Sequence, residues 1–218
     1  MSQKNAAPSP RTRVKRVHER GAYDRTTIDA ILDASPIAHV GYIFEDAPFV
    51  TPTLHWREGD HVYWHGSAAS RMIETADGAE VCLTVTLLDG LVLARSAFHH
   101  SANYRSVMLF GRATLISDPE AKEARLKAFM EGLVPGRWET LRPILQKELK
   151  ATSILSMPII EASAKVRTGP PKDDEPDYAL DIWAGTLPLQ ISTGAPVDDP
   201  RLKPGLCVPE AVRGVKIG

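Results

Sequence analysis

The segment from Val81 to Leu87 most narrowly limits what this chain can fold into. Apolar and smaller, more polar side chains alternate along it, with Val81, Leu83, Val85 and Leu87 on one side and Cys82, Thr84 and Thr86 on the other. Successive side chains of a β-strand point to opposite faces, so this period of two predicts a strand with one buried face. The other face carries small hydroxyl groups, which suit either solvent or a flat ligand.

Similar segments on both sides of this strand predict a β-rich fold. They cover residues 37–43, 49–56, 62–65, 91–97, 104–115, 152–159, 161–167 and 178–183. Turn signals at Glu58-Gly59-Asp60 and Asp89-Gly90 join neighbouring strands as hairpins. Both faces of 104–115 carry apolar side chains, which a barrel inside a dimer would cover. We therefore expect a mainly β fold with added helices (α+β), a barrel of about six to eight antiparallel strands.

Helices are expected between the strands. Thr26 and Asp29 resemble a capping box at the start of a first helix, and a short helix is expected near 68–75. Asp118-Pro119 is typical of the start of a longer helix. Neither a Rossmann phosphate loop, a Walker sequence, a G-x-S-x-G elbow nor an H-E-x-x-H pair occurs in the sequence.

Length and composition indicate one domain with two extensions. The chain has 218 residues and a net charge of −1, which argues against a dedicated nucleic-acid binder. No apolar run is long enough to span a bilayer, the N-terminus does not resemble a secretory signal, and the two cysteines form no C-x-x-C pair, so we expect a cytoplasmic protein without membrane contact. We expect a mobile basic arm over 1–22, a domain over 23–190 and an irregular extension over 191–218.

The stretch from His65 to Ile73 combines a strand end, a glycine and a helix start. Ser67, Ser70 and Arg71 fall in the first turn of the expected helix. Unpaired backbone N–H groups, two hydroxyls and a guanidinium together would suit a phosphate monoester. Equally, Ser67 could be an ordinary helix cap and Arg71 a solvated side chain.

The order of several short segments resembles the flavin-binding split-barrel superfamily, the pyridoxamine-5′-phosphate-oxidase-like proteins, in the branch of the nitroimidazole-resistance proteins. The segments are PTLH at 52–55, HGSAASR at 65–71, VTLLDG at 85–90, ARSAFHHS at 94–101, NYRSV at 103–107 and IWAG at 182–185. The resemblance covers about residues 20–190 and implies a homodimeric split barrel that binds FMN between its subunits.

The resemblance also implies which residues contact the flavin. Those along the isoalloxazine ring would be Val50, Thr51 and Thr53. The phosphate would be held by His65, Ser67, Ser70 and Arg71. Ser106 and Trp183 would also reach the flavin, and with a weaker basis Lys165 and Arg167. Beside the resemblance, Thr84 and Thr86 could donate to the flavin edge or simply face solvent. Arg105, next to Tyr104, could be a second phosphate or substrate contact or an ordinary cation at a strand end. The Arg-x-His pattern that selects pyridoxal phosphate is missing, since residues 190–218 contain no His.

Several functions stay open on the sequence. The first is an FMN-dependent oxidoreductase acting on a small substrate, with NAD(P)H as a donor and His65 as acid, base or substrate anchor. The second is a flavin carrier or sensor without catalysis. The third is a haem protein that uses His99 or His100, although adjacent histidines point apart and ordinary loop histidines are the simpler interpretation. No metal site is expected.

Overall fold

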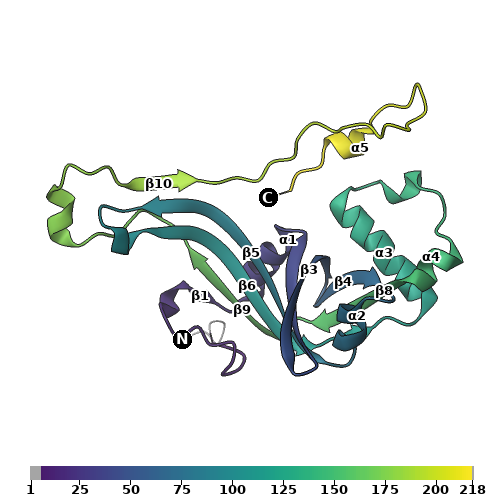
Figure 1. The fold of residues 1–218 in the computed structure, drawn as a ribbon, viewed down its shortest axis with the longest axis horizontal. Helices are drawn as coiled ribbons and strands as arrows, with labels where there is room; N and C mark the ends of the chain where they lie inside the picture. The colour runs from purple at the N-terminus through teal and green to yellow at the C-terminus, as the bar shows by residue number, and fades with distance from the viewer. Residues whose placement is uncertain (1–5, 218) are drawn as a thin grey trace.

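A computed structural model describes residues 6–217 and contains one antiparallel sheet curled into a barrel (Figure 1). Its strand order is β1-β9-β6-β5-β2-β3-β4-β8-β7, and β10 pairs with β5. The strands are β1 (Gly21–Ala22), β2 (Ile37–Phe44), β3 (Ala47–Glu58), β4 (His61–Ser67), β5 (Glu80–Leu93), β6 (Ser101–Arg112), β7 (Thr114–Leu115), β8 (Thr152–Pro158), β9 (Glu161–Arg167) and β10 (Gly185–Pro188). The mainly β, α+β fold is confirmed, and very short strands such as β1 and β7 raise the strand number above the expected range.

Five α-helices within residues 6–217 accompany the sheet. They are α1 (Arg25–Asp33), α2 (Arg71–Ala76), α3 (Pro119–Leu133), α4 (Gln146–Ala151) and α5 (Glu210–Arg213). Asp118 caps α3 by accepting from the Ala121 amide, as its position before Pro119 predicts. The expected capping box of α1 is wrong, because the cap is Asp24, whose carboxylate accepts from Thr27. No helix within residues 6–217 is long and apolar enough to cross a membrane.

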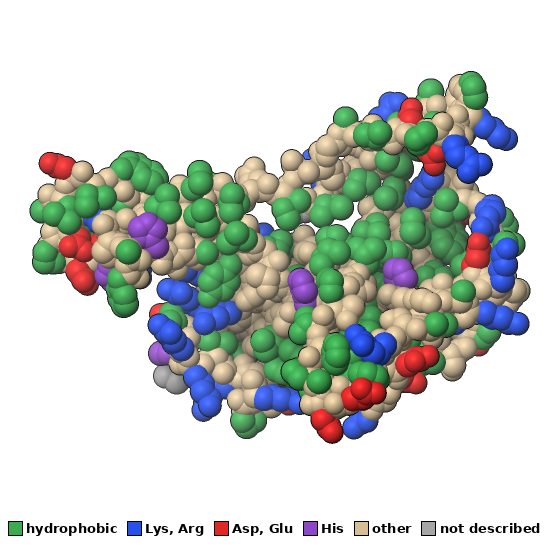
Figure 2. Space-filling view, viewed as in Figure 1, with side chains coloured by type: hydrophobic (Ala, Val, Ile, Leu, Met, Phe, Trp, Pro, Cys, Tyr) green, Lys and Arg blue, Asp and Glu red, His purple; other side chains and the backbone are tan. Residues whose placement is uncertain are grey.

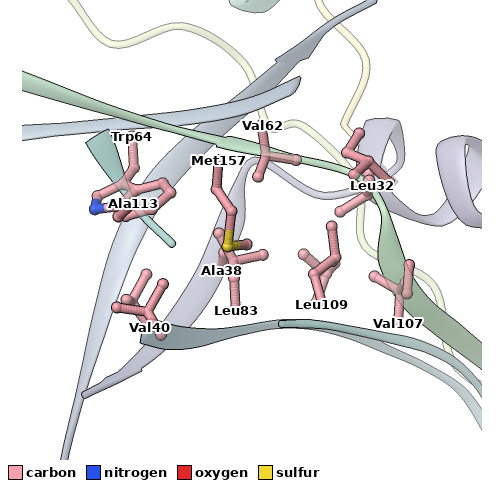
Figure 3. Close-up of a cluster of buried hydrophobic side chains, with 14 of the residues drawn as sticks. Leu32, Ala38, Val40, Val62, Trp64, Leu83, Val107, Leu109, Ala113 and Met157 are labelled. Atoms are coloured by element: carbon pink, nitrogen blue, oxygen red, sulfur yellow. The ribbon is translucent and has the colours of Figure 1, made fainter. Parts of the chain in front are cut away.

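The main core lies on the concave face of the sheet (Figure 3). Trp64 from β4 and Met157 from β8 face Val40 and Leu83 from the opposite wall, and all four are fully buried. Leu32 of α1 closes one end of this core. Burial of side chains of this size stabilises the fold by about 1.5–3 kcal/mol each, so the alternation in β5 fixes which face of the sheet is inside.

A long arm projects from the barrel (Figure 1). β5 and β6 continue beyond the barrel as a two-stranded ribbon, and β10 adds a third strand beside β5. The turn expected at Asp89-Gly90 is wrong: β5 passes through these residues with an irregularity in its register. The strand expected over 178–183 is also wrong, because a 3₁₀-helix occupies Glu175–Ala179 and the next strand is β10.

The two chain ends differ in how they meet the barrel. The N-terminal segment 1–22 was expected to be a mobile arm. Over its described part, 6–22, it lies against the barrel, where Arg11 pairs with Glu80 and Glu161 and β1 pairs with β9. Over 191–217, α5 is the only helix or strand described. Residues 1–5 and 218 of these two expected segments lie outside the described residues.

Gly111 tests how closely the barrel walls pack. A Cβ at this position would lie 2.9 Å from Cγ of Met157, which is fully buried. We expect Gly111→Ala to lower the free energy of unfolding by about 1–3 kcal/mol in urea denaturation. Gly132→Ala in α3, where nothing lies within 4 Å of the added Cβ, is the matched control and should not destabilise. Equal stability of the two variants would contradict this packing.

Candidate functional site

Arg71 is the centre of the predicted phosphate-binding group of Ser67, Ser70 and Arg71, called the phosphate grip below. It is the first residue of α2, and its guanidinium lies 4.3 Å from the ring centroid of Phe49 and 5.2 Å from that of Phe44. The Ser70 side chain, at the helix cap, makes no capping hydrogen bond. Arg71 is exposed and has no carboxylate partner within the described chain, so its charge is available to an anion.

Polar groups of the neighbouring strands complete this end of the barrel. The hydroxyls of Thr51 and Tyr42 lie 3.4 Å apart, and the hydrogen bond with Thr51 and the nearby Arg71 lower the pKa of Tyr42. Thr53 Oγ1 lies 3.4 Å from the carbonyl oxygen of His65. The Ser67 hydroxyl accepts from the Ala69 amide. The structure thus brings Thr51, Thr53, Ser67, Ser70 and Arg71 to one region.

A second group of predicted contacts lies on the opposite face of the sheet. Thr51 pairs with Val40, which pairs with Leu83 of the core, so Thr51 and Thr53 are on the inner face. On the outer face, Thr84 pairs with His39 and Thr86 pairs with Ser106. Val50 shares this outer face and is 66% exposed. One flavin cannot touch both groups through the sheet of a single chain.

The remaining predicted contacts lie on or near the arm. Arg105 donates two hydrogen bonds to Asp89, which raises the pKa of Arg105 and leaves it already paired. Tyr104 pairs with Leu88 and Arg167 at the base of the arm. Trp183 is 70% exposed, and its ring lies over Gly185 at the start of β10. The structure does not bring Trp183 or Arg105 to Arg71 within one chain.

His65 points away from the phosphate grip. Its ring lies 4.8 Å from that of Phe129 in α3 and 6.0 Å from that of Trp56. Its Nδ1 is buried without a hydrogen-bond partner among the described residues. Burial lowers the pKa of His65, so the imidazole is neutral at pH 7 and its ring can act as a ligand or a base.

A cavity beside these rings includes a histidine that the sequence analysis missed. The cavity measures about 400 Å³ and lies between α1, β3, α3 and the C-terminal segment; its lining includes His55, Trp56, Phe129, Arg57 and Lys216. Figure 2 shows a hollow floored by hydrophobic side chains beneath the C-terminal segment. His55 is buried, neither ring nitrogen has a partner in the described chain, and desolvation lowers its pKa. Alternation in β3 could have indicated this burial, but not the cavity.

The histidine pair of the sequence analysis lies elsewhere. His99 is 3.4 Å from a carboxylate oxygen of Asp174, and His100 Nδ1 is 2.8 Å from the carbonyl oxygen of Ser96. Both are at the turn of the arm, between β5 and β6. In the described part of the chain, no three His, Cys, Asp or Glu side chains gather as a metal site.

Comparison with known proteins identifies the family. Residues 24–166 match the family described as Pyridoxamine 5'-phosphate oxidase. The chain belongs to this family. The resemblance to the flavin-binding split-barrel proteins is thereby confirmed. No curated protein matches the sequence.

Solved structures extend the likeness over nearly the whole chain. The flavocytochrome Anf3 from Azotobacter vinelandii is 54% identical with a TM-score of 0.94, over 97% of this chain and 99% of that one. The FAD and heme binding protein from Mycobacterium smegmatis is 36% identical with a TM-score of 0.87, over 90% and 97%. A protein from Bacteroides thetaiotaomicron, provisionally described as a 5-nitroimidazole antibiotic resistance protein, is 22% identical with a TM-score of 0.55, over 67% and 86%, and shows the fold alone.

Proposed function

We propose that this protein is a flavocytochrome that binds one flavin and one haem without covalent attachment. The observation that carries the proposal is the 54% identity, over almost the full length of both chains, with a protein described as a flavocytochrome. The 36% identical relative is described as binding FAD and heme, which supports the same pair of groups. The sequence has no C-x-x-C-H motif, so a covalently attached c-type haem is not expected.

Arg71 is proposed to bind the flavin phosphate. Its guanidinium is held on the Phe44 and Phe49 rings, has no acidic partner in the described chain and stands beside the Ser70 hydroxyl. Such a fork suits two oxygens of a phosphate, and a stacked guanidinium loses little freedom on binding. The family resemblance predicts FMN, whereas the Mycobacterium relative is described as binding FAD. Both carry a phosphate at the ribityl 5′ position, which Arg71 would hold in either case.

The cavity lined by His55, Trp56 and Phe129 has features that suit a haem, although His65 is not among its lining residues. Trp56 and Phe129 provide flat apolar walls, and Lys216 provides a cation for a carboxylate group, whereas Arg57 is already paired with Asp33. His65 contacts the same two aromatic rings, is neutral at pH 7, and has a buried nitrogen that lacks a partner in the described chain. An imidazole is a common axial ligand of haem iron. We therefore propose His65 as the axial ligand, in place of the acid–base role expected from the sequence.

The protein is proposed to be an oxidoreductase. Flavins exchange hydrides or single electrons and haem exchanges single electrons, so the pair supplies redox chemistry that side chains do not. The residues present bind and position: Arg71 holds phosphate, while Trp56 and Phe129 exclude water from His65. The substrate is proposed to be small, with NAD(P)H as a donor. Pyridoxal phosphate is not proposed, because the C-terminal segment lacks the Arg-x-His pattern.

A homodimer is proposed as the working unit. The outer face of the sheet exposes large apolar side chains, with Ile43 59% and Val50 66% exposed on neighbouring strands. The arm exposes others, among them Trp183. A second copy would cover this face and would bring outer-face residues of one chain towards the phosphate grip of the other. The division of the predicted flavin contacts between two faces would then have a physical reason.

Replacement of Arg71 tests the flavin site. Arg71→Ala should weaken flavin binding about tenfold to a hundredfold, because a charge-assisted hydrogen bond contributes about 1.5–3 kcal/mol. The measurement is quenching of flavin fluorescence during titration of the flavin-free protein with FMN and with FAD. Arg213→Ala, an exposed arginine of α5, is the control and should bind as the wild type does. Wild-type affinity in Arg71→Ala would contradict the assignment.

Replacement of His65 tests the haem site. His65→Ala should abolish the Soret band of the haem-reconstituted protein, and added imidazole should restore part of it. His61→Ala, on the same face of β4, removes an imidazole near Tyr63 and should keep the band. If His65→Ala keeps the Soret band while His55→Ala or His99→Ala loses it, the axial ligand is that other histidine.

Charges on the outer sheet face test the dimer. Ile43→Lys together with Val50→Lys should convert a dimer to a monomer, measured by light scattering after size exclusion, because association would bury two unpaired cations. Val197→Lys, at a side chain that is 94% exposed in the C-terminal segment, is the control for added charge. A monomeric wild-type protein, or a dimer that survives both lysines, would contradict this interface.

A further inference from the structure

A basic cavity separate from the phosphate grip lies where the N-terminal segment meets the base of the arm. It measures about 570 Å³ and is lined by residues of 16–20, 98–101 and 166–172. Four cations line it, Arg16, Arg20, Arg167 and Lys172, against the single carboxylate of Glu19. Figure 2 shows Lys and Arg side chains gathered over the N-terminal segment.

Arg167 makes this cavity more than a patch of surface charge. The residue is only 8% exposed, at the end of β9. Its guanidinium donates to the side-chain oxygen of Asn103 and to the carbonyl oxygens of Gly169 and Pro170. Its Nε is buried and has no partner among residues 6–217. Every acceptor it does have is neutral, so the buried charge is not compensated.

Neighbouring cations add to the uncompensated positive charge at Arg167. Burial lowers the pKa of Arg167, and the nearby charge of Arg20 lowers it further. In the described chain, Arg16, Arg20, Arg167 and Lys172 form no ion pair. Glu19 lies 3.9 Å from His18, and the nearby Asp174 contacts His99. A buried charge without a counter-ion is costly, and two neighbouring like charges add to that cost, so an anion in the cavity would stabilise the arrangement.

An aromatic ring at the edge of the cavity narrows the class of anion. Phe98 lines the cavity, is 89% exposed and rests edge-on against His99. A ring so placed offers its face to a planar base, while the cations beneath it suit phosphate oxygens. We infer that this cavity binds the adenosine diphosphate part of a dinucleotide, with Arg20 and Arg167 on the pyrophosphate and Phe98 under the adenine. FAD, NADH and NADPH share this part. A nicotinamide dinucleotide here is compatible with a flavin at Arg71, whereas the ribityl phosphate of an FAD bound here would be half of this pyrophosphate and would not lie at Arg71 of the same chain.

Titration calorimetry with ADP and inorganic pyrophosphate tests the inference on the full-length protein. Arg20→Ala and Arg167→Gln should each weaken both ligands at least tenfold. Phe98→Ala should weaken ADP at least fivefold and leave pyrophosphate unchanged. Arg201→Ala, an exposed arginine of the C-terminal segment, is the matched control. Arg20 is half-buried and lies outside the barrel core, so its variant remains informative if Arg167→Gln does not fold.

The same variants identify the source of the diphosphate. If Arg20→Ala weakens NADPH and NADH but keeps the flavin content and flavin affinity of the wild type, the cavity belongs to a nicotinamide donor. If Arg20→Ala weakens FAD but not FMN, the cavity holds the adenosine half and the pyrophosphate of FAD, and Arg71 of the same chain does not hold the FAD phosphate. Absence of ADP and pyrophosphate binding at millimolar concentration, or equal affinity in wild type, Arg20→Ala and Arg167→Gln, would overturn the inference. Titration of Arg71→Ala with FMN, which has no pyrophosphate, tests the Arg71 site separately from this cavity.

Discussion

Antiparallel pairing of β2, β3, β5 and β6 decides where every candidate group lies. Because the inner face of this sheet holds the apolar core, with Val40 and Leu83 fully buried, the register of each strand is fixed to the residue. That register puts Thr51 on the inside and Thr84 on the outside. It also places the Phe49 ring where Arg71 can stack on it. A slip of one residue in β3 would exchange the two faces and dismantle both groups.

Desolvation is the second physical constraint. His55 and His65 come from paired strands but face opposite ways, because His55 lies opposite Trp64, the neighbour of His65. Burial lowers the pKa of both imidazoles, so both remain neutral where an exposed histidine would begin to ionise. Arg167 shows the converse case, since a buried guanidinium cannot lose its proton under ordinary conditions. Neutral imidazoles suit an iron ligand, whereas a buried cation with only neutral acceptors favours an anion beside it.

Local sequence patterns predicted those features that depend on local physics. The alternation at 81–87 gave the inner face of β5, and Asp118-Pro119 gave the start of α3. Asp89-Gly90 was misleading because the glycine serves close packing: a Cβ on Gly90 would lie 2.9 Å from the carbonyl oxygen of Leu187 in β10. The apolar residues at 178–183 have the composition of a strand, but no neighbouring strand pairs with them. Sequence alone contains neither of these tertiary facts.

In the candidate site, too, local sequence patterns indicated some residues, whereas others join only through tertiary packing. Ser67, Ser70 and Arg71 could be found from a strand end, a glycine and a helix start, and their role as flavin contacts stays a prediction. Tyr42 and Phe49 join them through the β2–β3 register, and His55 joins the cavity through the packing of α1 and α3, so no local pattern indicated these residues. Trp183 lies on the arm, and only a second chain could carry it to a flavin.

The cofactor content of the purified wild-type protein tests the central proposal most directly. The protein would be produced with haem supply, its released flavin identified by mass, and its haem quantified as the pyridine complex. We expect a flavin and a b-type haem, each at about one per chain. A protein that contains neither group, and takes up neither on reconstitution, would contradict it.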